Sequence, residues 1–177
     1  MARRRESEAQ APGTAPDETA LARAWAALAQ VTDPEIPVLS LEDLGVIRDV
    51  RIVDSGVQVD ITPTYSGCPA MTVMALDIEA ALAAAGFQDV RVKTVLSPAW
   101  TTDLMSDEGR RRLRAYGIAP PAKGALQRAL FGDDEPTACP QCGALETAKI
   151  SEFGSTPCKA LWRCNSCGEP FDAFKCI

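Results

Sequence analysis

The chain of 177 residues has seven cysteines and no histidine, and its 18 basic and 24 acidic residues give a net charge of −6. The lack of histidine excludes Ser-His and Cys-His relays and histidine-ligated metal sites. The acidic balance disfavours nucleic-acid binding, and no apolar run approaches the roughly 18 residues that a membrane-spanning helix needs. An odd number of cysteines without a secretory leader predicts a cytoplasmic protein whose thiols bind metal or react.

Apolar periodicity, prolines and capping residues predict a small α+β domain over residues 17–118, after a disordered polar tail at 1–16. The predicted element order is α-β-β-α-β-α, with the helices layered on a small sheet. The elements are a helix from Asp17, hairpin strands at 46–53 and 57–62, a helix ending at Gly86, a strand at 90–95 and a helix at 106–116.

Residues 119–137 are predicted to be a linker, because they combine Pro120-Pro121 with an acidic stretch ending in Pro136. A short helix is predicted inside it, over residues 125–131. Six of the seven cysteines follow this linker. The change in composition predicts a second module at residues 138–177.

Two C-x-x-C-G motifs in this module predict a metal site formed by four thiolates. Their cysteines are Cys139, Cys142, Cys164 and Cys167. Four sulfur ligands close a tetrahedral site and leave no position for water or substrate, which favours a structural zinc ion over a catalytic one. Tetrahedral sulfur also suits iron, and the sequence does not separate the two metals. Short strands at 147–153 and 159–163 complete a predicted zinc ribbon.

Cys158 and Cys176 are not part of either motif. They are either buried apolar fillers, the commoner fate of a free cysteine, or a second thiol pair that holds a transferable cluster.

Cys68 is the only cysteine before the linker, and it stands between Gly67 and Pro69. Proline suits the first position of a helix, so Cys68 is expected at or near the helix N-cap, where the dipole can lower the pKa of a thiol. The alternative is a small hydrophobe buried against the sheet. Asp33 and Glu35, in a proline-rich loop, are either paired acids or polar loop residues.

Several motifs together resemble a known family. They are Asp33-Pro34-Glu35-Ile36-Pro37, Asp43-Leu44-Gly45-Val46-Ile47, Thr64-Tyr65-Ser66-Gly67-Cys68-Pro69-Ala70-Met71, the stretch from Ser97 to Ser106, and the ending Pro170-Phe171-Asp172-Ala173-Phe174-Lys175-Cys176. The first three resemble the iron–sulfur assembly domain associated with the SUF system. Beyond its N-terminal tail, the whole chain resembles the PaaD family, the D subunits of phenylacetyl-CoA epoxidase systems.

The resemblance implies a non-catalytic role in aerobic phenylacetate catabolism. The family is thought to help assemble or insert an iron–sulfur cluster in the reductase component of the epoxidase. Cys68 would then be the cluster-handling thiol, with Asp33, Glu35, Gly67 and Pro69 in the same motif set. Partners would be the reductase, the other epoxidase components and SUF-type machinery. The cofactors would be structural zinc and a transient iron–sulfur cluster. The alternatives are a scaffold subunit and, least favoured, a nucleic-acid-binding ribbon.

Overall fold

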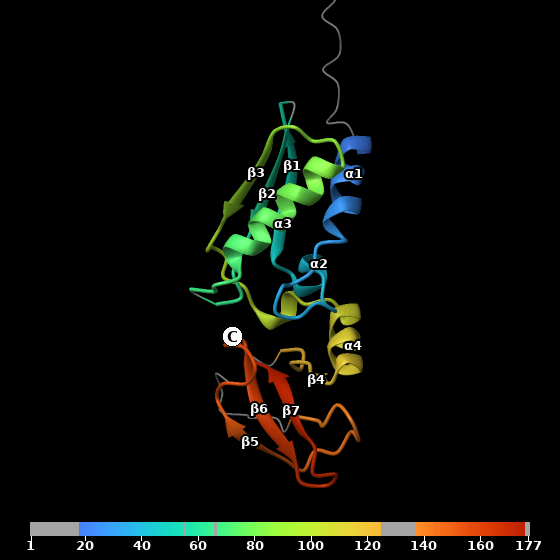
Figure 1. Cartoon of the computed structure of the whole chain (residues 1–177), viewed down its shortest axis with the longest axis vertical. Coiled ribbons are helices and arrows are strands. Elements are labelled where there is room, and N and C mark those ends of the chain that lie inside the picture. The colour runs from blue at the N-terminus through green and yellow to red at the C-terminus, as the bar shows by residue number, and fades with distance from the viewer. Residues whose placement is uncertain (1–17, 55, 66, 125–136, 176–177) are drawn as a thin grey trace, which may run out of the picture.

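The structure is a computed structural model that describes residues 18–54, 56–65, 67–124 and 137–175. Its elements in chain order are α1 (Glu18–Leu28), α2 (Leu41–Leu44), β1 (Ile47–Val53), β2 (Gly56–Ile61), α3 (Met71–Ala84), β3 (Val90–Thr94), the 3-10 helix η1 (Thr102–Leu104), α4 (Asp107–Tyr116), β4 (Ile118–Ala119), β5 (Thr147–Ser151), β6 (Lys159–Cys164) and β7 (Pro170–Phe174). Elements α1 to α4 are called the N-terminal unit below, and β4 with residues 137–175 the ribbon. Figure 1 shows the ribbon beneath the N-terminal unit.

The N-terminal unit is built on a three-stranded sheet in the order β1-β2-β3. Strands β1 and β2 form the predicted antiparallel hairpin, and β3 returns parallel to β2 after the crossover through α3. Helices α1 and α3 pack on each other. In addition, α1 packs on β1, and α3 packs on β3. The predicted α-β-β-α-β-α order is confirmed, with the short helices α2 and η1 added.

The core of the unit lies between the sheet and these helices. Alternate residues of β2 enter it, as do residues of α3 spaced by one helical turn. The buried set includes Val57, Val59, Ile61, Met74, Ile78 and Leu82. The apolar periodicities of two residues in β2 and 3.6 residues in α3 therefore identified the core-facing sides of these elements correctly.

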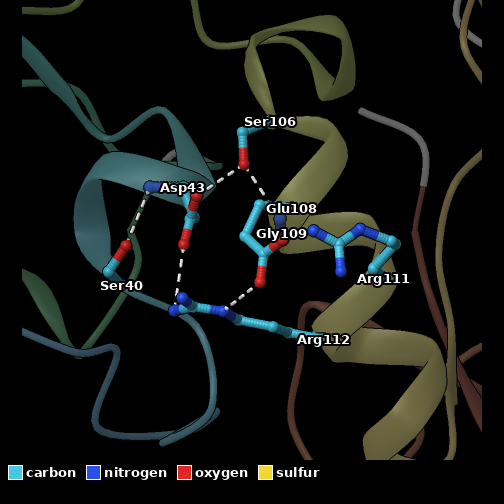
Figure 2. Close-up of polar contacts among 7 residues, drawn as sticks. All are labelled: Ser40, Asp43, Ser106, Glu108, Gly109, Arg111 and Arg112. Atoms are coloured by element: carbon cyan, nitrogen blue, oxygen red, sulfur yellow. Dashed lines mark hydrogen bonds and ion pairs between the residues drawn. The ribbon is translucent and has the colours of Figure 1, made fainter.

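Helices α2 and α4 are joined by a polar network centred on Asp43 (Figure 2). The Ser40 hydroxyl caps α2 by accepting the Asp43 amide at 3.0 Å. Ser106 donates to an Asp43 carboxylate oxygen at 2.5 Å and accepts the Gly109 amide at 2.8 Å. Arg112 pairs with the other Asp43 oxygen at 3.2 Å. The predicted cap of α4 at Ser106 is confirmed, and the same hydroxyl ties two helices together.

The ribbon is a four-stranded sheet in the order β4-β7-β6-β5. Strands β5, β6 and β7 are antiparallel neighbours, whereas β4 pairs parallel to β7 through Ile118 and Ala119. The segment predicted as a linker thus begins in a strand of the ribbon sheet. The helix predicted over 125–131 falls outside the described residues.

The ribbon packs against the N-terminal unit through its own apolar side chains. Cys158 and Phe174 belong to the same buried cluster as the core of that unit. The Phe174 ring lies 6.0 Å from the Trp100 ring, and the Trp100 indole donates to the Leu44 carbonyl at 2.9 Å. Within the described residues, no helix has the length and apolar character needed to cross a membrane.

Candidate functional site

The two C-x-x-C-G motifs form tight turns at one end of the ribbon. Gly143 donates to the Cys139 carbonyl at 2.9 Å, and Gly168 donates to the Cys164 carbonyl at 3.0 Å. Both glycines have positive φ angles, 77° and 82°, a conformation that L side chains rarely adopt. The glycine that follows each cysteine pair is therefore required by the turn.

The turns bring four thiols together, as the spacing predicts. The Sγ atoms of Cys139 and Cys167 are 3.9 Å apart and those of Cys142 and Cys164 are 3.6 Å apart. All four sulfurs lie within 4.8 Å of one another. Zinc–sulfur bonds of about 2.3 Å in a tetrahedron place sulfurs about 3.8 Å apart. The donor set therefore fits a tetrahedral metal ion held by four thiolates.

The backbone of the second motif also favours thiolate. The amides of Cys167 and Ser166 point at the Cys164 sulfur and lower the pKa of that thiol to about 6. At Cys142 the Ala144 amide acts in the same direction, but the thiols of Cys167 and Cys164 outweigh it and raise the pKa to about 12. Crowded thiols cannot all ionise without a cation, so metal binding here is coupled to proton release.

Cys68 lies near the start of α3, two residues before the N-cap at Ala70. The helix begins at Met71 with Ala70 as its N-cap, so Pro69 is not the first helical residue as predicted. Gly67 has a φ of 87° and turns the chain, and the Cys68 amide donates to the Tyr65 carbonyl at 3.3 Å. The Cys68 side chain is half-buried against the core of the N-terminal unit. Cys68 is therefore close to the start of a helix, as the first alternative predicts, and packed against the core, as the second predicts.

The pKa of the Cys68 thiol is raised, opposite to the direction expected from a helix terminus. Burial is the main cause, and the negative charges of Glu35 and Asp33 add to it. The Ala70 amide and the Tyr65 hydroxyl act in the opposite direction but do not prevail. Local sequence patterns do not place the two acids beside this thiol, because Cys68 belongs to a different loop.

Asp33 and Glu35 differ in their surroundings. Asp33 is buried, and one of its carboxylate oxygens accepts the amides of Glu35 at 2.7 Å and Ile36 at 2.9 Å. Burial raises the pKa of Asp33, and these two hydrogen bonds oppose the shift. Asp33 thus shapes the loop that presents Glu35, whose side chain is partly exposed.

Cys158 is buried immediately before β6, with 6% of its surface exposed. Its sulfur lies 3.0 Å from the Thr156 hydroxyl and 3.8 Å from a Glu35 carboxylate oxygen. The other unassigned thiol, Cys176, falls outside the described residues. Tyr65 was not predicted as a site residue, although it stands in the same motif as Cys68.

Two known families match separate parts of the chain. The family described as "Iron-sulfur cluster assembly protein" matches residues 21–94, and the family described as "PaaD zinc beta ribbon domain" matches residues 123–175. The first range ends with β3 and the second contains the four-cysteine site. The fold and the site together define a protein with an iron–sulfur assembly domain joined to a zinc ribbon.

Comparison with individual proteins shows which family within this class the chain resembles. An Escherichia coli (strain K12) protein, named as the D subunit of a "Putative 1,2-phenylacetyl-CoA epoxidase", is 51% identical over 153 residues, which cover 86% of this chain and 91% of that protein. The chain belongs to the PaaD family. A Bacillus subtilis (strain 168) protein, "Fe-S protein maturation auxiliary factor YitW", is 37% identical over 82 residues, 45% of this chain and 79% of that protein. A solved DUF59 domain from Bacillus anthracis matches with a TM-score of 0.51 and 25% identity, covering 54% of this chain and 92% of that one.

Proposed function

We propose that this chain is an accessory subunit of a phenylacetyl-CoA epoxidase system in aerobic phenylacetate catabolism. In this role it helps to assemble an iron–sulfur cluster or to insert it into the reductase component. The observation that carries the proposal is the 51% identity to the Escherichia coli epoxidase protein over most of both chains. The match of residues 21–94 to an iron–sulfur assembly family and the 37% identity to a maturation factor over 82 residues support the cluster-related part.

In this proposal the cluster is cargo and Cys68 is the thiol that contacts it. Cys68 is half-buried beside an exposed turn at Gly67, so a partner can approach it from one side. Asp33 holds the neighbouring loop in shape, and Pro69 restricts the chain that leads into α3. The cluster would come from SUF-type machinery in the cytoplasm, where thiols remain reduced.

The ribbon cysteines would hold a zinc ion in a structural role. When bound, the ion supplies a cross-link between the two turns that contain Cys139 and Cys164. The ribbon then presents a stable surface to the other epoxidase components. Oxygenation of the substrate is assigned to those components and not to this chain.

The proposal is tested by co-expressing the reductase with Cys68→Ser or wild-type chain. We expect the variant to keep its fold and lower the iron and acid-labile sulfide content of the reductase several-fold. Val73→Ser, an exposed change on the neighbouring helix, is the control and should leave reductase loading unchanged. Normal cluster content with Cys68→Ser would refute the role of this thiol.

A second function, that of a scaffold, is supported by the word "subunit" in the name of the Escherichia coli relative. A scaffold would hold the epoxidase components together without touching a cluster. Cys68→Ser would then be silent, while loss of the ribbon metal would release the chain from the complex. Pull-down of the components with each variant separates the two functions.

A further inference from the structure

The contact between the ribbon and the N-terminal unit brings together chemistry-bearing side chains that are distant in sequence. Cys158 and Glu35 are separated by 123 positions, yet their sulfur and carboxylate oxygen are 3.8 Å apart. Cys68 lies close enough for the Glu35 charge to raise its pKa. We call Glu35, Cys68 and Cys158 the junction cluster. Its donor atoms, two sulfurs and a carboxylate, come from both parts of the protein.

Hydrogen bonds hold two members of this cluster in place. The Asp33 carboxylate accepts the Glu35 amide and so anchors the loop that presents the Glu35 side chain. The Cys158 sulfur is held by the Thr156 hydroxyl at 3.0 Å, and its backbone is fixed by a main-chain bond from Lys175 that continues the pairing of β6 with β7. The thiol is thereby held beside the Glu35 carboxylate.

The surroundings of the cluster favour a cation. Asp33 is buried close by, and its charge raises the pKa of both Cys68 and Cys158 after the larger effect of burial. Lys159 is the basic group that acts on Cys158 and Asp33, and its ammonium also lies 3.8 Å from the carboxylate of Asp172. The Lys159 ammonium therefore faces the carboxylates of Asp33 and Asp172, and the Glu35 carboxylate beside Cys158 adds a further negative charge, which leaves room for additional positive charge.

An independent sign of a missing ligand is the Tyr65 hydroxyl. Its oxygen is buried, and among the described residues no nitrogen or oxygen atom lies in hydrogen-bonding geometry to it. Burial raises the pKa of this phenol, and the nearby groups of Cys68, Glu35 and Cys158 add to the shift, so the hydroxyl lies beside all three members of the junction cluster. A bound group or its water ligand would supply the hydrogen bond that a buried hydroxyl needs.

We propose that Cys68, Cys158 and Glu35 form a second metal site, shared between the N-terminal unit and the ribbon, that binds iron(II) transiently. This inference rests on the proposed function and deepens it, because the ribbon then supplies a ligand as well as a docking surface. Thiolate sulfur and carboxylate oxygen together suit a divalent transition metal. As the ion binds, each thiol releases its proton to solvent and the metal keeps its oxidation state.

The site differs from the ribbon centre in being open. Among the described residues, the ribbon cysteines are the set whose three or more donor atoms all lie within 4.8 Å of one another. In the junction cluster the Cys158 sulfur and the Glu35 oxygen are already within that range, and Cys68 must move toward them. Three protein ligands leave a coordination position for a partner, which is the arrangement expected for transfer rather than storage.

The test is cobalt(II) titration of anaerobic, reduced full-length protein whose ribbon has been filled with one zinc ion per chain. Cobalt(II) is the probe because its bonds to thiolate give intense near-ultraviolet absorption. We expect one further cobalt ion per chain, with thiolate absorption, while the zinc stays bound. Cys68→Ser and Cys158→Ser should each weaken this binding at least about tenfold and lower the thiolate absorption.

Two further variants keep the test decisive. Glu35→Gln removes a ligand charge without a change in size and should also weaken cobalt binding. Glu152→Gln, an exposed carboxylate of the ribbon, is its matched control and should bind cobalt as the wild type does. Circular dichroism and zinc content show whether each variant has folded, and Cys158→Ala replaces Cys158→Ser if the buried hydroxyl disrupts folding.

The results separate this inference from the proposed function. No second cobalt ion, or unchanged binding in folded Cys158→Ser and Cys158→Ala, would overturn the shared site even if Cys68→Ser still lowers reductase loading. Cobalt binding that depends on both cysteines, together with normal reductase loading in Cys68→Ser, would support the site and refute the maturation role.

Discussion

Trp100 joins the two parts of the protein, and its replacement by phenylalanine gives a quantitative test of that contact. Its side chain is 3% exposed, and its indole donates to the Leu44 carbonyl at 2.9 Å. Trp100→Phe leaves this buried carbonyl without its donor, at a cost of about 1–3 kcal/mol. The smaller ring leaves a void worth about 1 kcal/mol. We therefore expect a loss of about 2–4 kcal/mol in the free energy of unfolding.

The assay is urea unfolding of the zinc-loaded, reduced protein, followed by circular dichroism and by tryptophan fluorescence. Trp162→Phe is the matched control, since Trp162 is only partly buried and contacts the Lys149 ammonium at 5.6 Å. A phenyl ring retains most of that contact, so the control should lose less than about 1 kcal/mol. Equal effects of the two substitutions, or a loss below about 0.5 kcal/mol for Trp100→Phe, would refute the reasoning.

Three further outcomes are expected. Removal of the ribbon metal by a chelator should make the ribbon sensitive to protease while the helical circular dichroism signal remains, because the described helices all precede the ribbon. Loss of the helical signal together with the protease resistance of the ribbon would show that the N-terminal unit depends on the metal. Ser106→Ala removes the cap of α4 and a hydrogen bond to Asp43, so it should lower the free energy of unfolding, measured with urea, by about 1–2 kcal/mol. The control is Ser166→Ala at an exposed serine, which should lower it by less than about 0.5 kcal/mol. Gly45 has a φ of 75°, and Gly45→Ala adds a Cβ 2.6 Å from a backbone oxygen. It should lower the melting temperature more than Gly117→Ala, because Gly117 has a similar φ of 93° but no neighbour within 4 Å of the added Cβ. Equal shifts would mean that the steric contact relaxes at no cost.

The fold was largely predictable because most of its elements are encoded locally. The Ser106 cap, the Gly117 stop and the alternation in β2 each depend on a few neighbouring residues. Strand β4 could not be predicted, because two residues contain no periodic pattern and their pairing with β7 is a long-range contact. The position of Pro69 was wrong by two residues, since α3 begins only at Met71.

The candidate site likewise has one part that local sequence predicts and one part that depends on tertiary packing. The convergence of the ribbon thiols was predictable because the spacing and the glycines determine the two turns, and the sulfur distances show the four thiols together. For Cys68 the sequence indicated a helix terminus and hence a lowered pKa. Burial and the charges of Glu35 and Asp33 raise it instead, and neither could be inferred from the residues next to Cys68.

By itself, the sequence determined that metal chemistry in this protein must use thiolate and carboxylate, since seven cysteines occur without a histidine. It also indicated which four of those cysteines converge, because the same C-x-x-C-G turn motif occurs twice in the second module. Only the tertiary structure decided that Glu35 lies against Cys158 and that its charge also acts on Cys68. That proximity arises from the packing of the ribbon on the N-terminal unit, a contact between surfaces that no local pattern specifies.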